Sequence, residues 1–274
     1  MRSPLVSIVI TTKNSARTLE KLLKSIKLQN YPRIEIIIVD NNSEDSTKKI
    51  ARKYTKKVFN KGPERSKQRN FGVFKSRGEY ILVLDSDMIL NRNVVKECVD
   101  LTIGGSNFKE IIVPEKSFGN GIWSEAKKLE REMNEGEEYF ESARFFDIKT
   151  FWEFEGFDEN MTGPEDWDLP QRIAKKYKVG RIKSYILHDE GKHSLLGLAK
   201  KKYYYGLSAY KYLKKQNLPI LGPTTVYFLR VGFYKRFYKL FKNPLVSLAM
   251  VIMLSAETVG GGLGYLIGRL RSET

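Results

Sequence analysis

The segment Leu5–Asp40 reads LVSIVITTKNSARTLEKLLKSIKLQNYPRIEIIIVD, and its pattern decides the fold. It contains two continuous runs of aliphatic and β-branched residues, Leu5–Ile10 and Ile34–Val39, which predict two buried strands. Between these runs, Ser15–Leu28 carries its leucines and isoleucine at helical spacing. Apolar strands joined by a helix predict a parallel sheet that is covered by helices on both faces.

The same alternation continues along the chain. A third strong strand is predicted at Tyr80–Leu84, and a weaker one at Ile111–Val113. The remaining predictions are helices at Ser46–Tyr54, Lys67–Arg77, Trp123–Glu138 and Asp166–Tyr177, a short strand at Val58–Phe59 and a late strand at Arg181–Leu187. We therefore expect an α/β domain with a Rossmann-like, mostly parallel sheet over residues 1–195.

The composition changes after residue 195. Ser194–Lys215 and Thr224–Lys242 predict two helices rich in lysine and aromatic residues. Leu245–Ile267 is apolar and contains one charged residue, Glu257. Residues 196–274 are therefore predicted to form a separate set of basic and apolar helices.

The charge of the chain predicts an anionic partner. The 48 Lys and Arg residues outnumber the 32 Asp and Glu residues, which gives a net charge of +16. The span Gly191–Ala256 is basic throughout and holds no acidic residue. Nucleic acid, a phospholipid surface and a phosphorylated substrate all fit this excess. The single cysteine, Cys98, excludes an intramolecular disulfide and a Cys-based zinc site, and it fits a reducing cytoplasm.

Polar side chains follow each strong strand. Thr11–Asn14, Asp40–Ser43 and Asp85–Asp87 occupy these positions. Ligands of open parallel sheets bind beyond the carboxyl ends of the strands. These three segments are therefore predicted to line one crevice.

The triplet Asp85-Ser86-Asp87 is a candidate metal site. Two carboxylates at i and i+2 beside a strand end are able to hold one hard divalent cation, and Mg²⁺ accepts a few carboxylates together with substrate phosphate oxygens. The same triplet also occurs in solvated turns. His188, after the late strand, is a further candidate ligand, although a lone histidine is more often structural.

Three other segments carry candidate chemistry. The carboxylate of Asp40 suits an N–H of a nucleobase, or alternatively an Asx turn. Arg65–Asn70 places cations at a helix start, which suits phosphate or a solvated helix face. Glu165 and Asp166 belong to an acidic cluster at another helix start, where one carboxylate is able to deprotonate an attacking hydroxyl.

Together these segments resemble the inverting family 2 glycosyltransferases of the GT-A fold, in their membrane-associated prokaryotic form. The similarity covers about residues 5–195. The segments that carry it are the opening strand and helix with VDNNSEDST, then RNFGVFKSRGEYILVLDSDMIL, and finally GFDENMTGPEDWDLPQRI. Their order and spacing match the family at four separate sites.

The resemblance implies roles for individual residues. Asp40 would contact the base, Arg69 the diphosphate, and Asp87 the metal as its main ligand. Asp166 would be the general base, with Glu165 beside it. The other implied residues are Thr11, Thr12, Asn14, Asn42, Asp85 and Ser86 at the nucleotide sugar, with Asp85 and His188 also at a Mg²⁺ or Mn²⁺ ion. Asn41-Asn42 replaces the common Asp-Gly, so the base stays open, with UDP favoured and GDP next.

The C-terminal residues predict contact with a membrane. Thr224–Lys242, with apolar residues on one side and cations on the other, is typical of an interfacial helix, or of a helix packed on the core. Leu245–Ile267 is long enough to span a bilayer, but Gly260-Gly261-Gly262 is expected to break or kink it and Glu257 is unfavourable in lipid. We therefore expect Leu245–Ile267 to lie in the surface of the membrane on its cytoplasmic side, with one transmembrane pass as the alternative. The spacing of Gly260, Gly264 and Gly268 also permits close helix packing.

These predictions describe an enzyme that takes a sugar from a nucleotide-diphosphate donor and passes it to a lipid-linked or glycan acceptor. A basic nucleic-acid-binding protein is the first alternative, but it does not account for acids clustered at 85–87 and 165–168. A non-catalytic sugar-nucleotide-binding module is the second alternative. Such a module would not need Asp166.

Overall fold

The computed structural model of the chain describes residues 3–137 and 140–273, and these divide into two compact units. The first unit contains Met1–Glu115, Ser142–Glu159 and Leu169–Asp189. The second contains Lys116–Glu141, Asn160–Asp168 and Glu190–Thr274. We predicted one domain boundary, at residue 195, whereas the chain passes between these two units several times.

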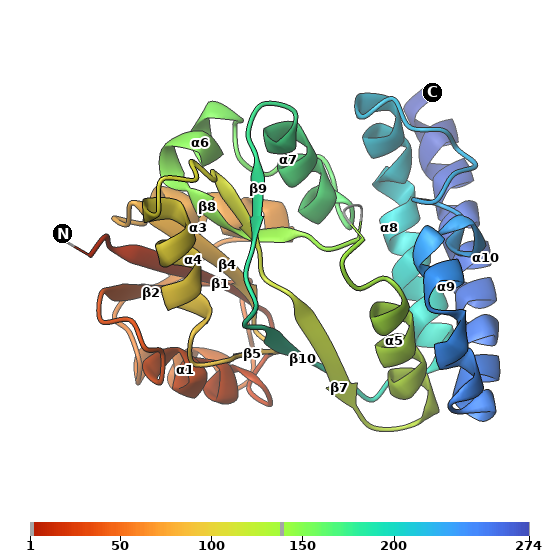
Figure 1. The fold of residues 1–274 in the computed structure, drawn as a ribbon, viewed down its shortest axis with the longest axis horizontal. Helices are drawn as coiled ribbons and strands as arrows, with labels where there is room; N and C mark the ends of the chain where they lie inside the picture. Colours follow the sequence, from red (N-terminus) through yellow and green to blue (C-terminus); the bar gives the residue numbers. More distant parts are fainter. Residues whose placement is uncertain (1–2, 138–139, 274) are drawn as a thin grey trace. The chain divides into compact units, whose positions relative to one another are not determined.

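The first unit is built on one large sheet (Figure 1). Among the described residues, seven strands have the order β3-β2-β1-β4-β8-β6-β9. Their bounds are β1 Val6–Thr12, β2 Ile34–Asp40, β3 Val58–Asn60, β4 Tyr80–Asp85, β6 Glu110–Ile112, β8 Ala143–Asp147 and β9 Val179–Arg181. Neighbours run parallel except for β8, which is antiparallel to both β4 and β6. The mostly parallel α/β fold is therefore confirmed.

Helices cover both faces of this sheet. Successive strand residues point to opposite faces, so Ile8 and Ile10 pack on one side and Val9 on the other. The first side is covered by α1 (Leu19–Lys27), α2 (Thr47–Arg52) and α4 (Val94–Ile103). The second is covered by α3 (Arg65–Phe74), α6 (Ile148–Glu153) and the later residues of α7 (Glu165–Ala174). This burial on both faces explains why the strands read as continuous apolar runs.

A short antiparallel pair brings distant residues together in the first unit. In it, β5 (Met88–Leu90) pairs with β10 (Ile186–Gly191), and His188 lies opposite Met88. The single strand predicted at Arg181–Leu187 is wrong, because β9 ends at Arg181 and β10 begins only at Ile186. The N–H groups of Lys183 and Ser184 both donate to Glu97, each at 2.9 Å, and this turns the chain between the two strands.

The second unit is a set of packed helices (Figure 1). It contains α5 (Ile122–Met133), α8 (Leu195–Lys215) and α10 (Pro244–Glu273), while β7 (Glu115–Gly119) joins it after Glu115. Its core includes Met133, Leu198, Met250, Met253 and Leu254. The predicted end of α5 at Glu138 lies outside the described residues.

The single helix predicted over Thr224–Lys242 is wrong. The structure has three short helical segments there, η1 (Tyr227–Leu229), α9 (Val231–Lys235) and η2 (Phe237–Phe241). Arg230, between the first two, is extended, and its buried guanidinium lies 4.0 Å from the centre of the Phe140 ring and 3.3 Å from Glu130. These tertiary contacts replace the helical hydrogen bonds that the periodicity predicted.

The expected break at Gly260-Gly261-Gly262 is also wrong, since α10 runs through it. A Cβ added at Gly260, Gly264 or Gly268 would lie 2.4, 2.1 and 2.1 Å from carbonyl oxygens of α8. The glycines therefore allow two helices to touch along their backbones, as the four-residue spacing predicted. Within the described residues, one helix (residues 244–272) is long and apolar enough to cross a membrane by length and composition.

Candidate active site

The site begins at the carboxyl ends of β1 and β2, where Asp40 is fully buried. Its carboxylate accepts hydrogen bonds from Thr12 Oγ1 at 2.8 Å, from the Ser43 N–H at 2.7 Å and from Ser43 Oγ at 2.5 Å. This is the geometry of an Asx turn, which was the alternative interpretation of Asp40. The carboxylate thus fixes the loop after β2, and its contact with a nucleobase stays a prediction.

The loops after β1 and β2 are tied to each other. Asn14 and Asn42 both adopt positive φ, at 48° and 51°, a conformation that asparagine tolerates better than most residues. The Asn14 N–H donates to Ser43 Oγ at 2.8 Å, and the Glu44 N–H donates to Asn14 Oδ1 at 2.9 Å. These polar residues of the predicted nucleotide pocket therefore hold each other in place.

Asp85 ends β4 beside two arginines. Its Oδ1 lies 3.0 Å from Arg69 and 3.4 Å from Thr11 Oγ1, and its Oδ2 lies 3.8 Å from Arg144. Burial opposes ionisation of this carboxyl, but the guanidinium groups of Arg69 and Arg144 outweigh it and hold the pKa of Asp85 well below its ordinary value. The negative charge of Asp85 is thus balanced by these two arginines of the protein.

Arg69 lies deeper than its predicted role at the diphosphate suggests. It is fully buried on α3, pairs with Asp85, and lies 5.1 Å from the centre of the Phe157 ring. In this position the Arg69 guanidinium contacts Asp85, so it would act on a bound ligand by way of that carboxylate. A direct contact between Arg69 and a diphosphate stays a prediction.

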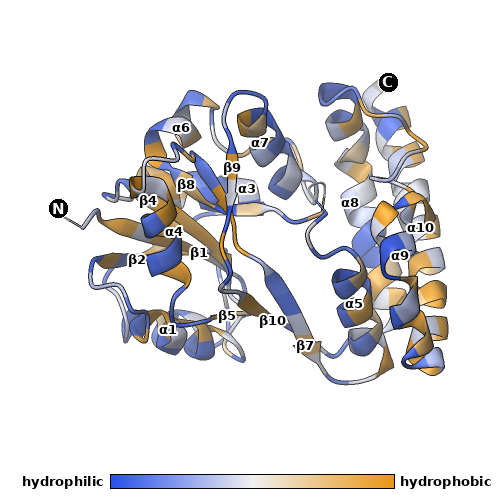
Figure 2. Ribbon diagram, in the orientation of Figure 1, coloured by the Kyte–Doolittle hydropathy of each residue, from blue (hydrophilic) through white to orange (hydrophobic). Residues whose placement is uncertain are grey.

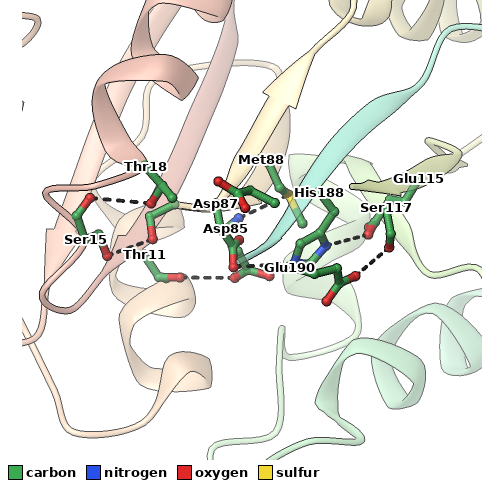
Figure 3. Close-up of polar contacts among 12 residues, drawn as sticks. Thr11, Ser15, Thr18, Asp85, Asp87, Met88, Glu115, Ser117, His188 and Glu190 are labelled. Carbon is green, nitrogen blue, oxygen red and sulfur yellow. Dashed lines mark hydrogen bonds and ion pairs between the residues drawn. The ribbon is translucent and has the colours of Figure 1, made fainter. Parts of the chain in front are cut away.

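Asp87 has a different environment from Asp85 (Figure 3). Its Oδ2 lies 3.4 Å from His188 Nε2, while its Oδ1 is buried and has no hydrogen-bond partner. The pairing of β5 with β10 explains this approach, because His188 lies opposite Met88, the neighbour of Asp87. A buried carboxylate oxygen without a hydrogen is a suitable ligand for a hard cation.

Glu115 completes this group, and the sequence did not reveal it. Its Oε2 lies 3.1 Å from His188 Nδ1, on the side of the ring away from Asp87 (Figure 3), and its Oε1 pairs with Arg144. A carboxylate only accepts hydrogen bonds, so Nδ1 carries a hydrogen toward Glu115, and a cation held beside Asp87 would take the lone pair of Nε2. Histidines that bind metals are commonly oriented in this way.

Two further contacts fix the ends of these strands. Ser86 Oγ donates to Ser15 Oγ at 2.8 Å, which ties the acidic triplet to the loop after β1. The exposed Arg17 reaches Asp189 at 2.8 Å, and the Asp189 N–H donates to the Asp87 carbonyl at 2.8 Å. Neither Arg17 nor Asp189 was predicted from the sequence.

The predicted acceptor-side acids lie at the start of α7, in the second unit. Glu165 is buried and accepts the N–H of Gly163. Asp168 is buried as well, and it is held by Lys215 at 3.1 Å and by Gln216 at 2.8 Å. Asp166 is partly exposed. The approach of Asp166 to Asp87, a residue of the first unit, stays a prediction.

A complete metal centre is not built from protein groups alone. In the described part of the chain, no cluster of three or more His, Cys, Asp or Glu residues has the arrangement of a metal site. Asp87 and His188 supply two suitable atoms, and both oxygens of Asp85 face guanidinium groups. These donors fit a cation that takes its remaining ligands from a diphosphate or water.

Comparison with known sequences points to one family of enzymes. Residues 7–141 match the family described as Glycosyl transferase family 2. The chain is 32% identical over 102 residues to the poly(ribitol-phosphate) β-N-acetylglucosaminyltransferase TarS of Staphylococcus aureus strain Mu50, covering 33% of this chain and 18% of that enzyme. It is 33% identical over 94 residues to the GalNAc(5)-diNAcBac-PP-undecaprenol β-1,3-glucosyltransferase of Campylobacter jejuni, covering 31% and 30%. The chain thus matches less than a third of either relative.

Solved structures share the fold. The mannosyltransferase PcManGT from Pyrobaculum calidifontis, solved with GDP-Man and Mn²⁺, has a TM-score of 0.64 at 14% identity, covering 97% of this chain and 88% of its own. Residues 1–349 of S. aureus TarS give a TM-score of 0.58 at 20% identity, covering 92% and 80%. These likenesses establish the architecture expected of the GT-A type.

Proposed function

The chain belongs to glycosyltransferase family 2, and we propose that it transfers a sugar from a nucleotide-diphosphate donor to a hydroxyl group with inversion at the anomeric carbon. The observation that carries this proposal is the match of residues 7–141 to the family, in which β4 ends at Asp85 and Asp87 follows two residues later. Asp87 keeps a buried oxygen without a hydrogen-bond partner there.

The donor would bind at the ends of β1, β2 and β4. Asp40 would reach the base by exchanging one of its internal hydrogen bonds, and Thr11, Thr12, Asn14, Asn42 and Ser86 would surround the nucleoside. Structures of TarS hold UDP and UDP-GlcNAc, and the PcManGT structure holds GDP-Man. We favour a UDP-sugar for this chain, with a GDP-sugar next.

Asp87 and His188 would hold a Mg²⁺ or Mn²⁺ ion at the diphosphate, with Asp85 beside the ribose. When bound, this ion neutralises the diphosphate and makes it a better leaving group. The PcManGT structure contains Mn²⁺. Arg69 and Arg144 hold Asp85 in place close to the same position.

Asp166 would act as the general base, with Glu165 at the sugar or acceptor. As the acceptor oxygen attacks, its proton passes to Asp166, a bond forms from that oxygen to the anomeric carbon, and the bond to the diphosphate oxygen breaks. A single displacement of this kind inverts the anomeric configuration. Partial exposure of Asp166 is compatible with such a role, whereas Asp168 is committed to Lys215 and Gln216.

The acceptor is proposed to be lipid-linked, and the enzyme to work at the cytoplasmic face of the membrane. The Campylobacter relative is named for an undecaprenol-linked substrate. In this chain, α10 is long and apolar enough for a membrane, and residues 196–274 would form the membrane-associating part. A glycan without a lipid is the alternative acceptor.

Thermal unfolding with a panel of nucleotide sugars tests the donor proposal. A UDP-sugar is expected to raise the melting temperature, more so with Mn²⁺ or Mg²⁺ present, because a ligand that binds only the folded state stabilises it. Asp87→Asn should remove the metal-dependent part of that rise. Asp100→Asn, an exposed residue paired with Lys96, is the matched control and should leave it unchanged. If no nucleotide sugar shifts the transition with either metal, the proposal fails.

A further inference from the structure

One face of α10 is exposed along its whole length and carries no charge between Pro244 and Gly268. Leu245, at its start, is 68% exposed, and Leu270, at its end, is 63% exposed. The exposed apolar residues recur at steps of three, four or seven positions, which keep to one side of a helix, at Leu245, Leu248, Ile252, Val259, Leu263, Leu266 and Leu270. They form a single stripe, and Figure 2 shows α10 coloured as apolar over much of its length. At 1.5 Å per residue the stripe is about 37 Å long.

The opposite face of α10 is sealed within the second unit. Glu257, the one charged residue of the span, is 2% exposed; it pairs with Lys127 at 2.7 Å and accepts from Tyr227 Oη at 2.9 Å. The glycine-lined side presses against the backbone of α8. The Glu257 carboxylate and the glycines that face α8 are therefore covered by protein. One face alone is available to a partner.

Beside α10 lies α8, which is rich in lysine. Gly260, Gly264 and Gly268 meet carbonyl oxygens of Ala199, Tyr203 and Leu207, so the two helices run alongside one another in the same direction. Exposed lysines occur on α8 at Lys200, Lys201, Lys211, Lys214 and Lys215. Lys200 and Lys201 follow Ala199, which meets Gly260 near the middle of α10, so an α10 that crossed a bilayer in this packing would carry these two cations into the hydrocarbon, where each is strongly unfavourable.

The surroundings of the stripe match a lipid surface. Lys242 precedes it and Arg269 and Arg271 close it, so both ends carry exposed cations. The segment that leads into α10 exposes Phe237 (59%) and Phe241 (73%), with Tyr234 and Tyr238 also exposed. Aromatic rings and cations around an apolar stripe are typical of helices in the plane of the headgroups, and the positive charge favours anionic lipids.

We propose that α10 lies along the surface of an anionic membrane, with this stripe in the acyl region and Glu257 turned toward protein, and that it does not span the bilayer. The inference rests on the membrane association included in the proposed function, and it adds the contact face and the orientation. Lys235, Arg236 and Lys239 are not the main contacts. Lys235 and Arg236 both pair with Glu137, and Lys239 pairs with Glu132, all within the second unit.

Spin-label depth measurements on the full chain test the orientation. Single cysteines replace Leu248, Val259 and Leu266, three positions on the stripe, while the one native thiol, Cys98, is buried. After binding to phosphatidylglycerol–phosphatidylcholine vesicles, the three labels should report the same shallow depth. A depth that peaks at position 259 and falls at both others would mean that α10 spans the membrane, and it would overturn the inference while membrane association stands.

Two matched variants distinguish binding of lipid to the stripe from binding of a second protein chain. Leu263→Lys should lower the bound fraction at least tenfold in vesicle sedimentation, whereas Leu28→Lys, an equally exposed leucine of the first unit (56% against 52%), should not. If the unaltered chain ignores vesicles and Leu263→Lys instead converts a dimer to a monomer, the stripe is a protein interface and the inference is overturned. Nucleotide-sugar binding is measured in the same samples without lipid, so failure of the donor proposal is seen independently.

Discussion

His188 Nδ1 lies 3.1 Å from Glu115 Oε2, although 73 positions separate the two residues. The contact fixes the ring so that Nε2 points to Asp87. Glu115 is therefore a positioning residue for the candidate metal ligand. Its own orientation is set by Arg144, which also lies 3.8 Å from Asp85.

Replacing Glu115 by alanine is expected to weaken Mn²⁺ binding by about 10–100-fold, because His188 loses the acceptor that orients it. Titration of Mn²⁺ by electron paramagnetic resonance, with UDP present, measures this affinity directly. Glu153→Gln, at an exposed carboxylate on α6, should leave it unchanged. Equal Mn²⁺ affinity in the Glu115 variant and the unaltered protein would exclude the positioning role.

Arg69→Met is expected to destabilise the first unit by about 3–5 kcal/mol, because it leaves Asp85 buried without its nearest cation. Urea unfolding followed by circular dichroism gives the free energy. The control is Arg77→Met at an exposed position, which should change stability by no more than about 0.5 kcal/mol. A loss below 1 kcal/mol at Arg69 would show that Arg144 alone compensates Asp85.

Glu110 on β6 predicts a pH dependence of stability. Both its carboxyl oxygens are buried without a hydrogen-bond partner, and burial raises its pKa to about 9 from 4.5. The folded state therefore keeps a proton that the unfolded chain releases, so the stabilising effect is complete below about pH 4.5 and is lost as the pH rises toward 9. The slope has an upper value of about 1.4 kcal/mol per pH unit.

Glu110→Gln should remove this slope and stabilise the protein relative to the unaltered chain between pH 6 and 9. Unfolding free energies of both proteins, measured across that range, give the difference directly. Parallel curves would mean that the folded state ionises Glu110 at an ordinary pH.

Gly264→Ala and Gly262→Ala test the contact between α8 and α10. A Cβ at Gly264 would lie 2.1 Å from the Tyr203 carbonyl, whereas one at Gly262 meets nothing within 4 Å. The first substitution is expected to destabilise the second unit by about 1–3 kcal/mol through overpacking. The second should stabilise it by about 0.5–1 kcal/mol through helix propensity. Thermal unfolding of both variants gives the comparison, and equal effects would contradict the close packing.

The sequence predicted the sheet where long apolar runs are buried on both faces. Leu5–Ile10, Ile34–Val39 and Tyr80–Leu84 are apolar on both faces and became β1, β2 and β4. The strand β8 (Ala143–Asp147) was missed, because ARFFD is short and contains Arg144, whose charge is compensated only by distant acids. Short strands that depend on tertiary partners leave no periodic signal.

The same limit applies to the site. Asp85, Asp87 and His188 follow predicted strand ends and were predicted together; in the structure His188 lies within β10, whose pairing with β5 brings Asp87 and His188 within 3.4 Å. Glu115 was missed because nothing in its local sequence, VPEKS, distinguishes it from a surface residue. The helix predicted at Thr224–Lys242 failed for the converse reason. Its periodicity was genuine, but ion pairs from Arg230, Arg236 and Lys239 to distant acids fixed another backbone path.

The most direct test of the account is the release of UDP from the preferred UDP-sugar by the unaltered protein and by Asp166→Asn, with donor affinity measured on the same samples. We predict that Asp166→Asn binds the donor with unchanged affinity and releases UDP about 10²–10⁴-fold more slowly, the usual contribution of a general base. Full UDP release by the Asp166→Asn protein would contradict the assignment of Asp166. The absence of release and of donor binding in the unaltered protein would contradict sugar transfer itself.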